Sequence, residues 1–83
     1  MRVDLTDRTT KDLDRLEHGQ PRLWVRIITK IKGLAIDPKM GKPLVGPLKG
    51  KWSLRVGEYR VIYEIRGNSV IVLTVNHRRE VYR

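Results

Sequence analysis

Apolar residues in the first third of the chain predict one short strand followed by two helices. Val3 and Leu5 alternate with polar neighbours, as in a half-buried strand. A short helix with one apolar edge then ends near Gly19. A second helix begins at Pro21 and stops at Pro38, and apolar residues recur in it at three- and four-residue spacing: Leu23, Trp24, Ile27, Ile28, Ile31, Leu34 and Ala35. Because so few residues join the helices, we expect an antiparallel hairpin.

The last third of the chain is rich in β-branched and aromatic residues and predicts three strands, at residues 52–56, 59–65 and 70–75. Gly57-Glu58 is a good two-residue hairpin turn, and a second tight turn follows at residues 66–69. Residues between these strands and the helices lack periodicity and are expected to form a loop. The pattern predicts an α+β fold: an N-terminal strand and an antiparallel helical hairpin packed on a C-terminal antiparallel β-meander, with the first strand at a sheet edge.

Length and charge narrow the class of protein. The 83 residues suffice for a single domain, residues 1–83, and contain no cysteine that could form a disulfide or a thiolate metal site. No signal peptide or long apolar run is visible, which predicts a cytoplasmic protein without a membrane segment. Eighteen Lys and Arg face nine Asp and Glu, and the excess lies after residue 20. Such a basic surface favours a polyanionic partner, most commonly a nucleic acid.

The predicted hairpin register gathers arginines on one face of the sheet. With Gly57-Glu58 as the turn, Arg55 lies directly opposite Arg60. Like charges at this spacing repel each other, so a structure that keeps them usually places an anion between them. The same register places Arg60 opposite Val75 and His77 on the side of Arg60. The tail returns to this neighbourhood with Arg78, Arg79 and Tyr82. Because the planar fork of arginine suits bidentate phosphate contacts, this face is expected to bind phosphate.

Cleavage of an RNA backbone would require more than cations on this face. The 2′-hydroxyl must lose a proton, the charged phosphorane must be stabilised, and the leaving 5′-oxygen must gain a proton. Arginines supply the second function, and His77 is the one histidine placed for proton transfer. Tyr82 could take part only if neighbouring cations favour its ionised form. No cluster of His and carboxylates has metal-ligand spacing, so no metal and no other cofactor is expected.

Two motifs resemble the RelE/ParE superfamily of toxin–antitoxin toxins. They are L-K-G-K-W-S-L-R-V-G-E-Y-R-V-I-Y-E-I at residues 48–65 and V-N-H-R-R-E-V-Y at residues 75–82, and the motif at residues 75–82 is similar to the RelE branch in particular. The resemblance implies a RelE-like fold and a toxin that cleaves mRNA in the ribosomal A site without a metal, neutralised by a cognate RelB-like antitoxin. The RelE type member carries two lysines on the first meander strand, where this chain has Ser53 and Arg55.

The resemblance and the register together give the candidate site. Catalytic roles are assigned to Arg55, Arg60, His77, Arg78 and Tyr82, and substrate contacts to Lys49, Lys51, Ser53, Arg79 and Arg83. Because guanidinium stays protonated, Arg55 cannot act as a general base, so His77 or Tyr82 must take a larger share. Two other functions stay open: a ParE-like toxin that inhibits DNA gyrase through protein contacts, and a plain RNA-binding module. Retention of Arg60, His77 and Tyr82 favours the ribonuclease.

Overall fold

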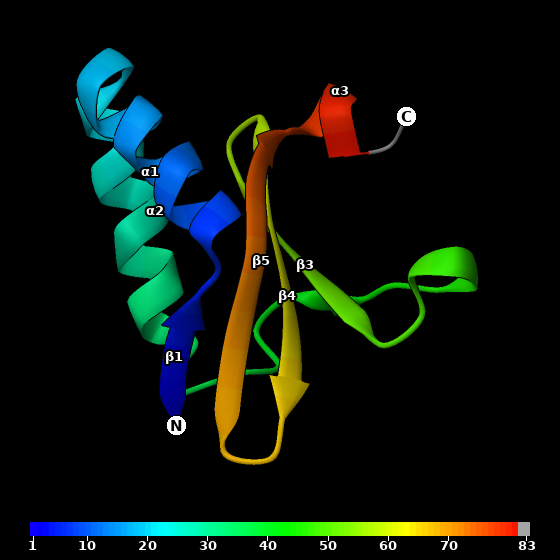
Figure 1. Ribbon diagram of the computed structural model, residues 1–83. Helices are drawn as coiled ribbons and strands as arrows, with labels where there is room; N and C mark the ends of the chain where they lie inside the picture. The colour runs from blue at the N-terminus through cyan, green and yellow to red at the C-terminus, as the bar shows by residue number, and fades with distance from the viewer. Residues whose placement is uncertain (82–83) are drawn as a thin grey trace.

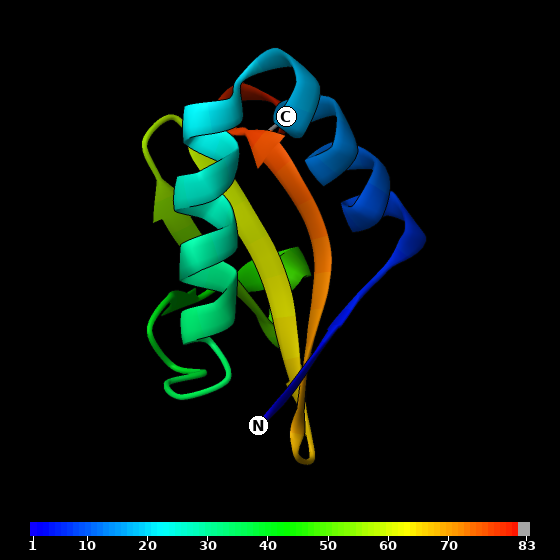
Figure 2. The same ribbon diagram turned by 90° about the vertical axis from the view of Figure 1, so that its left-hand side faces the viewer.

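The computed structural model describes residues 1–81, with side chains described through Arg79. In chain order, the elements are β1 (Arg2–Leu5), α1 (Asp7–Gly19), α2 (Pro21–Gly33), β2 (Lys42–Pro43), the 3-10 turn η1 (Gly46–Leu48), β3 (Lys51–Val56), β4 (Tyr59–Arg66), β5 (Ser69–His77) and α3 (Arg78–Val81). The antiparallel α1–α2 hairpin covers one face of a five-stranded sheet (Figures 1 and 2). None of the helices in the described part is long and apolar enough to cross a membrane.

Capping and proline residues set where the two long helices begin. The hydroxyl oxygen of Thr6 accepts a hydrogen bond from the Thr9 backbone N–H (3.1 Å), which caps the first turn of α1. Pro21 occupies the first turn of α2, where its missing N–H leaves no helical bond unmade. The predicted second helix was too long, because α2 ends at Gly33 and the next residues form turns. Ile27 and Ile31 bury the inner face of α2 against the sheet.

The strand order is β1-β5-β4-β3-β2. The meander is confirmed, and β1 joins its edge as expected, running parallel to β5. Three short elements were not predicted: β2, η1 and α3. β2 pairs with β3 over two residues, too few for any apolar alternation to be recognised. The core between the sheet and the helical hairpin includes Leu34, Val61 and Val72, none of which is exposed.

Helix α1 covers the edge of β5 beyond the point where β1 ends. β1 pairs with β5 only as far as Val72. The Thr9 hydroxyl donates to the Val72 carbonyl (2.8 Å), and the Thr6 hydroxyl donates to the Leu73 carbonyl (2.9 Å). The buried Asp12 carboxylate accepts from the Val75 backbone N–H at 3.0 Å. The N-cap residue Thr6 and two side chains of α1 thus satisfy backbone groups at the edge of β5 that would otherwise lack a partner.

A β-bulge in this region changes the register of the distal half of β5. Ile62 pairs with Thr74 and Tyr63 pairs with Val72, so Leu73 is an extra residue on β5. Beyond the bulge, Arg60 pairs with Asn76 rather than with Val75. The predicted β4–β5 register is therefore wrong by one residue at this end, whereas the β3–β4 register is confirmed.

Tyr63 anchors the irregular segment between α2 and β2. Its ring is fully buried and stacks on Trp52, with centroids 6.2 Å apart. Its hydroxyl donates to the Pro38 carbonyl (2.7 Å) and accepts from the Gly41 N–H (3.1 Å). Burial raises the pKa of Tyr63 above the usual 10.0; the Gly41 hydrogen bond lowers it and the negative charge of Asp37 raises it.

We expect Tyr63→Phe to lower the free energy of unfolding by about 1–2 kcal/mol, because two half-buried backbone groups lose their partner. Urea denaturation measures this, with Tyr59→Phe as the control, since the Tyr59 hydroxyl is engaged only by an exposed Gln20 amide among the described interactions. The folded state favours the neutral phenol of Tyr63, so its contribution persists below pH 10 and is lost as pH rises through the raised pKa. An equal loss in both variants would contradict this assignment.

Candidate functional site

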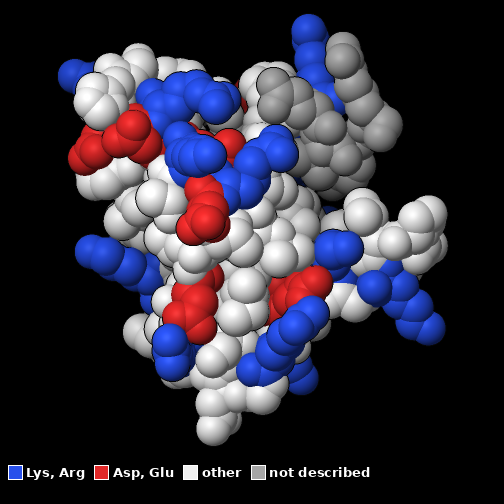
Figure 3. Space-filling view, viewed as in Figure 1, with Lys and Arg blue, Asp and Glu red and all other residues white. Residues whose placement is uncertain are grey.

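Basic side chains gather on the sheet face that α1 and α2 leave uncovered. Strand alternation places Ser53 and Arg55 of β3 on this face, and the register adds Arg60 from β4 and Asn76 from β5. Lys42 joins them because it pairs with Ser53 across the β2–β3 ladder. In Figure 1 this face lies on the side away from the helical hairpin, between α3 and the arm that carries η1. Figure 3 shows Lys and Arg side chains projecting from that arm.

A cleft of about 450 Å³ marks the centre of this face. Its polar lining consists of Lys42, Ser53, Arg55 and Arg60, together with the backbone around Gly41. No Asp or Glu of the described residues lines it. Three cationic side chains thus border a cleft without a compensating carboxylate, an arrangement suited to an anion.

Backbone carbonyls orient the two arginines. Arg55 Nε donates to the Gly57 carbonyl (3.2 Å), and Arg60 Nη1 donates to the Tyr59 carbonyl (3.4 Å). Arg55 is exposed, whereas Arg60 is half-buried in the central strand β4. The turn itself requires Gly57, whose φ of 59° lies in the left-handed region, and it brings Arg55 opposite Arg60.

Arg78 lies at the start of α3 and forms an ion pair with Glu58, with Nε and Oε2 2.9 Å apart. Its backbone N–H also donates to the Glu58 carbonyl (2.8 Å), which fixes the first residue of α3 against the β3–β4 turn. Arg79 and Lys49 are exposed, in α3 and before β3 respectively. None of these three residues lines the cleft. Tyr82 and Arg83 lie outside the described residues.

Lys51 shares strand parity with Ser53 and Arg55 but lies at the far end of β3. It pairs in register with Glu64, whose carboxylate forms an ion pair with Arg66 (2.8 Å). Lys51 does not line the cleft. It therefore shares the face of the cleft but lies outside it.

His77 does not lie beside Arg60, contrary to the sequence expectation. The bulge at Leu73 pairs His77 with Tyr59 on the helix side of the sheet. The two rings make an edge-to-face contact with centroids 5.5 Å apart. His77 Nδ1 accepts a 3.3 Å hydrogen bond from the Arg79 backbone N–H. His77 therefore supports Tyr59 and lies on the opposite face from the basic cleft.

Sequence reasoning missed Lys42 and Asn76. Lys42 lies in a strand of two residues, and Asn76 pairs with Arg60 only because of the bulge, without lining the cleft. One signal was available for Lys42: the glycine before it. A Cβ at Gly41 would lie 2.8 Å from both the Ser53 carbonyl oxygen and the Tyr63 hydroxyl, so only glycine permits this close approach of β2 to β3.

The structure thus defines a small α+β protein with a helical hairpin on one face of its sheet and a basic cleft on the other. Comparison with protein families matches residues 3–82 to the family described as ParE toxin of type II toxin-antitoxin system, parDE. The chain therefore belongs to this toxin family, within the RelE/ParE superfamily.

Individual relatives agree with this assignment. Toxin RelG of Mycobacterium tuberculosis is 35% identical over 98% of this chain and 94% of its own length. Toxin YoeB of a Synechocystis strain is 29% identical over 89% of this chain and 92% of its own length. The crystal structure of the toxin–antitoxin complex RelBE2 from M. tuberculosis contains a chain with 34% identity and a TM-score of 0.80, covering 93% of this chain and 90% of that one. The predicted superfamily and fold are thus confirmed.

Proposed function

We propose that this toxin is a ribosome-dependent endoribonuclease that cleaves mRNA in the ribosomal A site and so inhibits translation. The observation that carries the proposal is the cross-strand pair Arg55 and Arg60, which borders a cleft together with Lys42 and without a carboxylate in the described lining. A pentacovalent phosphorane carries more negative charge than the phosphodiester from which it forms. The cleft therefore offers most stabilisation where that charge develops.

The reaction that fits this site is an internal transesterification. The 2′-oxygen attacks the adjacent phosphorus, the bond from phosphorus to the 5′-oxygen breaks, and the products are a 2′,3′-cyclic phosphate and a 5′-hydroxyl. One proton leaves the 2′-hydroxyl and one reaches the 5′-oxygen, so no water or redox partner is consumed. Arg55 and Arg60 stabilise the non-bridging phosphate oxygens, and Ser53 hydrogen-bonds the substrate from the cleft floor.

In this proposal, side chains other than His77 transfer the protons, because His77 lies on the helix side of the sheet, opposite the basic cleft. Lys42 lines the cleft, and its ammonium can give up a proton, unlike a guanidinium. Tyr82 is the second candidate. Arg78 lies outside the cleft lining and is paired with Glu58, so we assign it a contact with the RNA beyond the cleft. The remaining basic residues contact the RNA backbone further out: Lys49, Lys51, Arg79 and Arg83. The ribosome completes the site by orienting the mRNA.

A cognate antitoxin is the second partner in this proposal. Solved complexes of RelBE2 from M. tuberculosis and of YoeB with YefM from Staphylococcus aureus each contain a toxin of this fold with its antitoxin. For this chain we propose a RelB-like antitoxin that shields the basic face and thereby keeps mRNA away from Arg55 and Arg60.

Inhibition of DNA gyrase is the second candidate function. The matching family is described by the ParE toxin of parDE, so a protein-binding toxin without nuclease activity is a direct alternative. The two functions differ in what the basic cleft does. A nuclease needs Arg60 for chemistry, whereas a gyrase inhibitor needs only a surface that binds protein.

The test is mRNA cleavage on purified ribosomes with an empty A site, compared with the same RNA free in solution and with excess chelator in every reaction. We expect cleavage within the A-site codon only on ribosomes, with a 2′,3′-cyclic phosphate end, in the presence of chelator. A folded toxin that binds ribosomes without cutting mRNA would refute the nuclease, and inhibition of gyrase supercoiling would then support the alternative.

Lys42→Ala should lower single-turnover cleavage on ribosomes by about 100-fold, the usual range for a positioned acid or base. Lys32→Ala provides the matched control, because Lys32 is an exposed lysine of α2 that lines none of the cleft. Thermal denaturation shows whether either variant alters the fold. Full activity in Lys42→Ala would remove Lys42 from the mechanism and leave proton transfer to Tyr82.

A further inference from the structure

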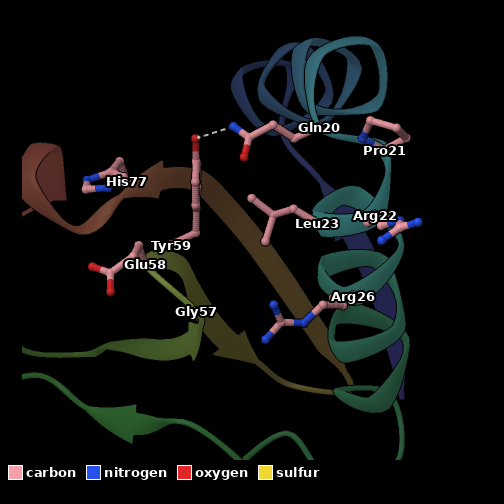
Figure 4. A pocket seen from close by; sticks show the side chains of 9 residues that line it. All are labelled: Gln20, Pro21, Arg22, Leu23, Arg26, Gly57, Glu58, Tyr59 and His77. Atoms are coloured by element: carbon pink, nitrogen blue, oxygen red, sulfur yellow. Dashed lines mark hydrogen bonds between the residues drawn. The ribbon is translucent and has the colours of Figure 1, made fainter.

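A second pocket lies on the helix side of the sheet, between α2 and the β3–β4 turn (Figure 4). Its volume is about 780 Å³, enough for a nucleotide. Leu23 and Arg26 extend from α2 toward the sheet, and Tyr59 stands at the opposite wall with its hydroxyl toward Gln20. The proposed cleavage reaction uses none of these four side chains.

The Tyr59 ring is the element of this pocket that suits a nucleobase. Two contacts restrain the orientation of the Tyr59 ring: the edge-to-face contact with His77 and the hydrogen bond from Gln20 Nε2 to the Tyr59 hydroxyl (3.2 Å). Leu23 adds an apolar surface to the same pocket. A half-buried, fixed aromatic ring is a platform on which any base can stack, because every base presents a π-face.

A cationic track connects this pocket with the basic cleft. Arg26 and Lys30 lie one helical turn apart on α2, about 6 Å along its axis. Both are exposed, and α2 contains no acidic residue. Neither forms an ion pair with any side chain described in the structure. A cavity of about 510 Å³ is lined by both residues and by Arg55, which also borders the cleft.

Gly57 shapes the passage between the two surfaces. The Arg26 Nη1 atom lies 3.7 Å from the position that a Cβ would take at Gly57, so the guanidinium rests against the bare turn. Arg55 donates to the carbonyl of the same glycine. The turn is thus flanked by one arginine on its helix side and by another on its cleft side.

We propose that the pocket binds one nucleotide of single-stranded RNA that flanks the cleaved bond, with its base on Tyr59 and the neighbouring phosphates on Arg26 and Lys30. The RNA passes from the cleft around the β3–β4 turn to reach it. That the bound RNA is the mRNA being cleaved rests on the proposed function. Arg55 borders both the cleft and the cavity beside Arg26 and Lys30, so one RNA strand can contact both. An acidic protein segment would use the same charges but would not require the Tyr59 ring.

The test is binding of a fluorescent, 2′-O-methylated RNA of about eight nucleotides, which cannot be cleaved because it lacks free 2′-hydroxyls. Two double variants remove the same charge: Arg26→Ala/Lys30→Ala in the track, and Lys32→Ala/Lys39→Ala at positions outside it. Loss of two single-strand phosphate contacts should reduce the slope of log affinity against log salt by about 1.4 and weaken binding about 25-fold near 0.1 M salt. The control pair should change affinity less than about three-fold. In the wild type, NMR signals of the Tyr59 ring should shift upon RNA binding.

Equal weakening by both pairs would overturn the proposal, since it would reflect net charge alone. Unchanged RNA affinity in the track variant would overturn it as well, and a loss of antitoxin affinity alone in that variant would assign the surface to an acidic protein. Because binding is measured without cleavage, the nuclease proposal and the pocket proposal can be refuted independently. A wild type that does not cut mRNA but loses RNA affinity in the track variant would refute the nuclease and retain the pocket.

Discussion

Arg60→Ala should reduce mRNA cleavage on ribosomes by about 100- to 1,000-fold, the loss typical when one donor to a developing oxyanion is removed. Arg60 lies in the central strand opposite Arg55 and borders the cleft with its guanidinium held by the Tyr59 carbonyl. The effect should appear in the single-turnover rate at saturating ribosomes, because the interaction strengthens as the phosphorane forms. Arg60→Lys should recover only part of the rate, since an ammonium lacks the bidentate fork.

Arg66→Ala is the matched control for this prediction. Arg66 ends the same strand, is exposed and contacts only Glu64 among the interactions described. The Arg66→Ala variant should cleave mRNA at the wild-type rate. Circular dichroism and thermal denaturation verify that Arg60→Ala is folded. A folded Arg60→Ala that cleaves as fast as Arg66→Ala would contradict phosphate stabilisation by Arg60.

Asp12→Ala should lower the free energy of unfolding by about 2–3 kcal/mol, the cost of removing a charged acceptor from buried donors. The Asp12 side chain is 5% exposed. It accepts hydrogen bonds from the Val75 N–H and from the Thr74 hydroxyl, each at 3.0 Å. Its loss leaves a buried N–H at the edge of β5 without a partner. Urea denaturation gives the change directly.

The control for Asp12 lies two residues further along the same helix. Asp14 is 71% exposed and should tolerate alanine within about 0.5 kcal/mol. Asp12→Asn keeps an acceptor oxygen and should recover part of the lost stability. If alanine at position 12 cost no more than alanine at position 14, the carboxylate would not be what satisfies the edge of β5.

The sequence predicted those parts of the fold that depend on local chemistry. A glycine-led two-residue turn sets the β3–β4 register, so the pairing of Arg55 with Arg60 followed from a few neighbouring residues. The β4–β5 register did not follow, because the bulge at Leu73 lies against helix side chains more than sixty residues earlier in the chain. The alternation of β5 does break between Val72 and Val75, but so short a break does not by itself identify a bulge.

For the candidate site too, the residues placed by local structure were predicted and those placed by long-range contacts were not. Ser53, Arg55 and Arg60 lie together because they belong to one hairpin. His77 was placed wrongly, since its position depends on the bulge, and Lys42 was overlooked, since only a close backbone approach at Gly41 brings it to β3. The expected roles of Tyr82 and Arg83 lie outside the described residues and stay predictions.

The parallel pairing of β1 with β5 has a consequence for biosynthesis. β1 pairs with β5, which follows the other four strands of this sheet along the chain, and Val3 faces Val70. During translation, the helical hairpin therefore leaves the ribosome well before the sheet on which it packs is complete. Such non-local pairing delays completion of the sheet until β5 is available. Until β5 has been made, the apolar inner face of the helical hairpin therefore lacks part of the sheet that buries it.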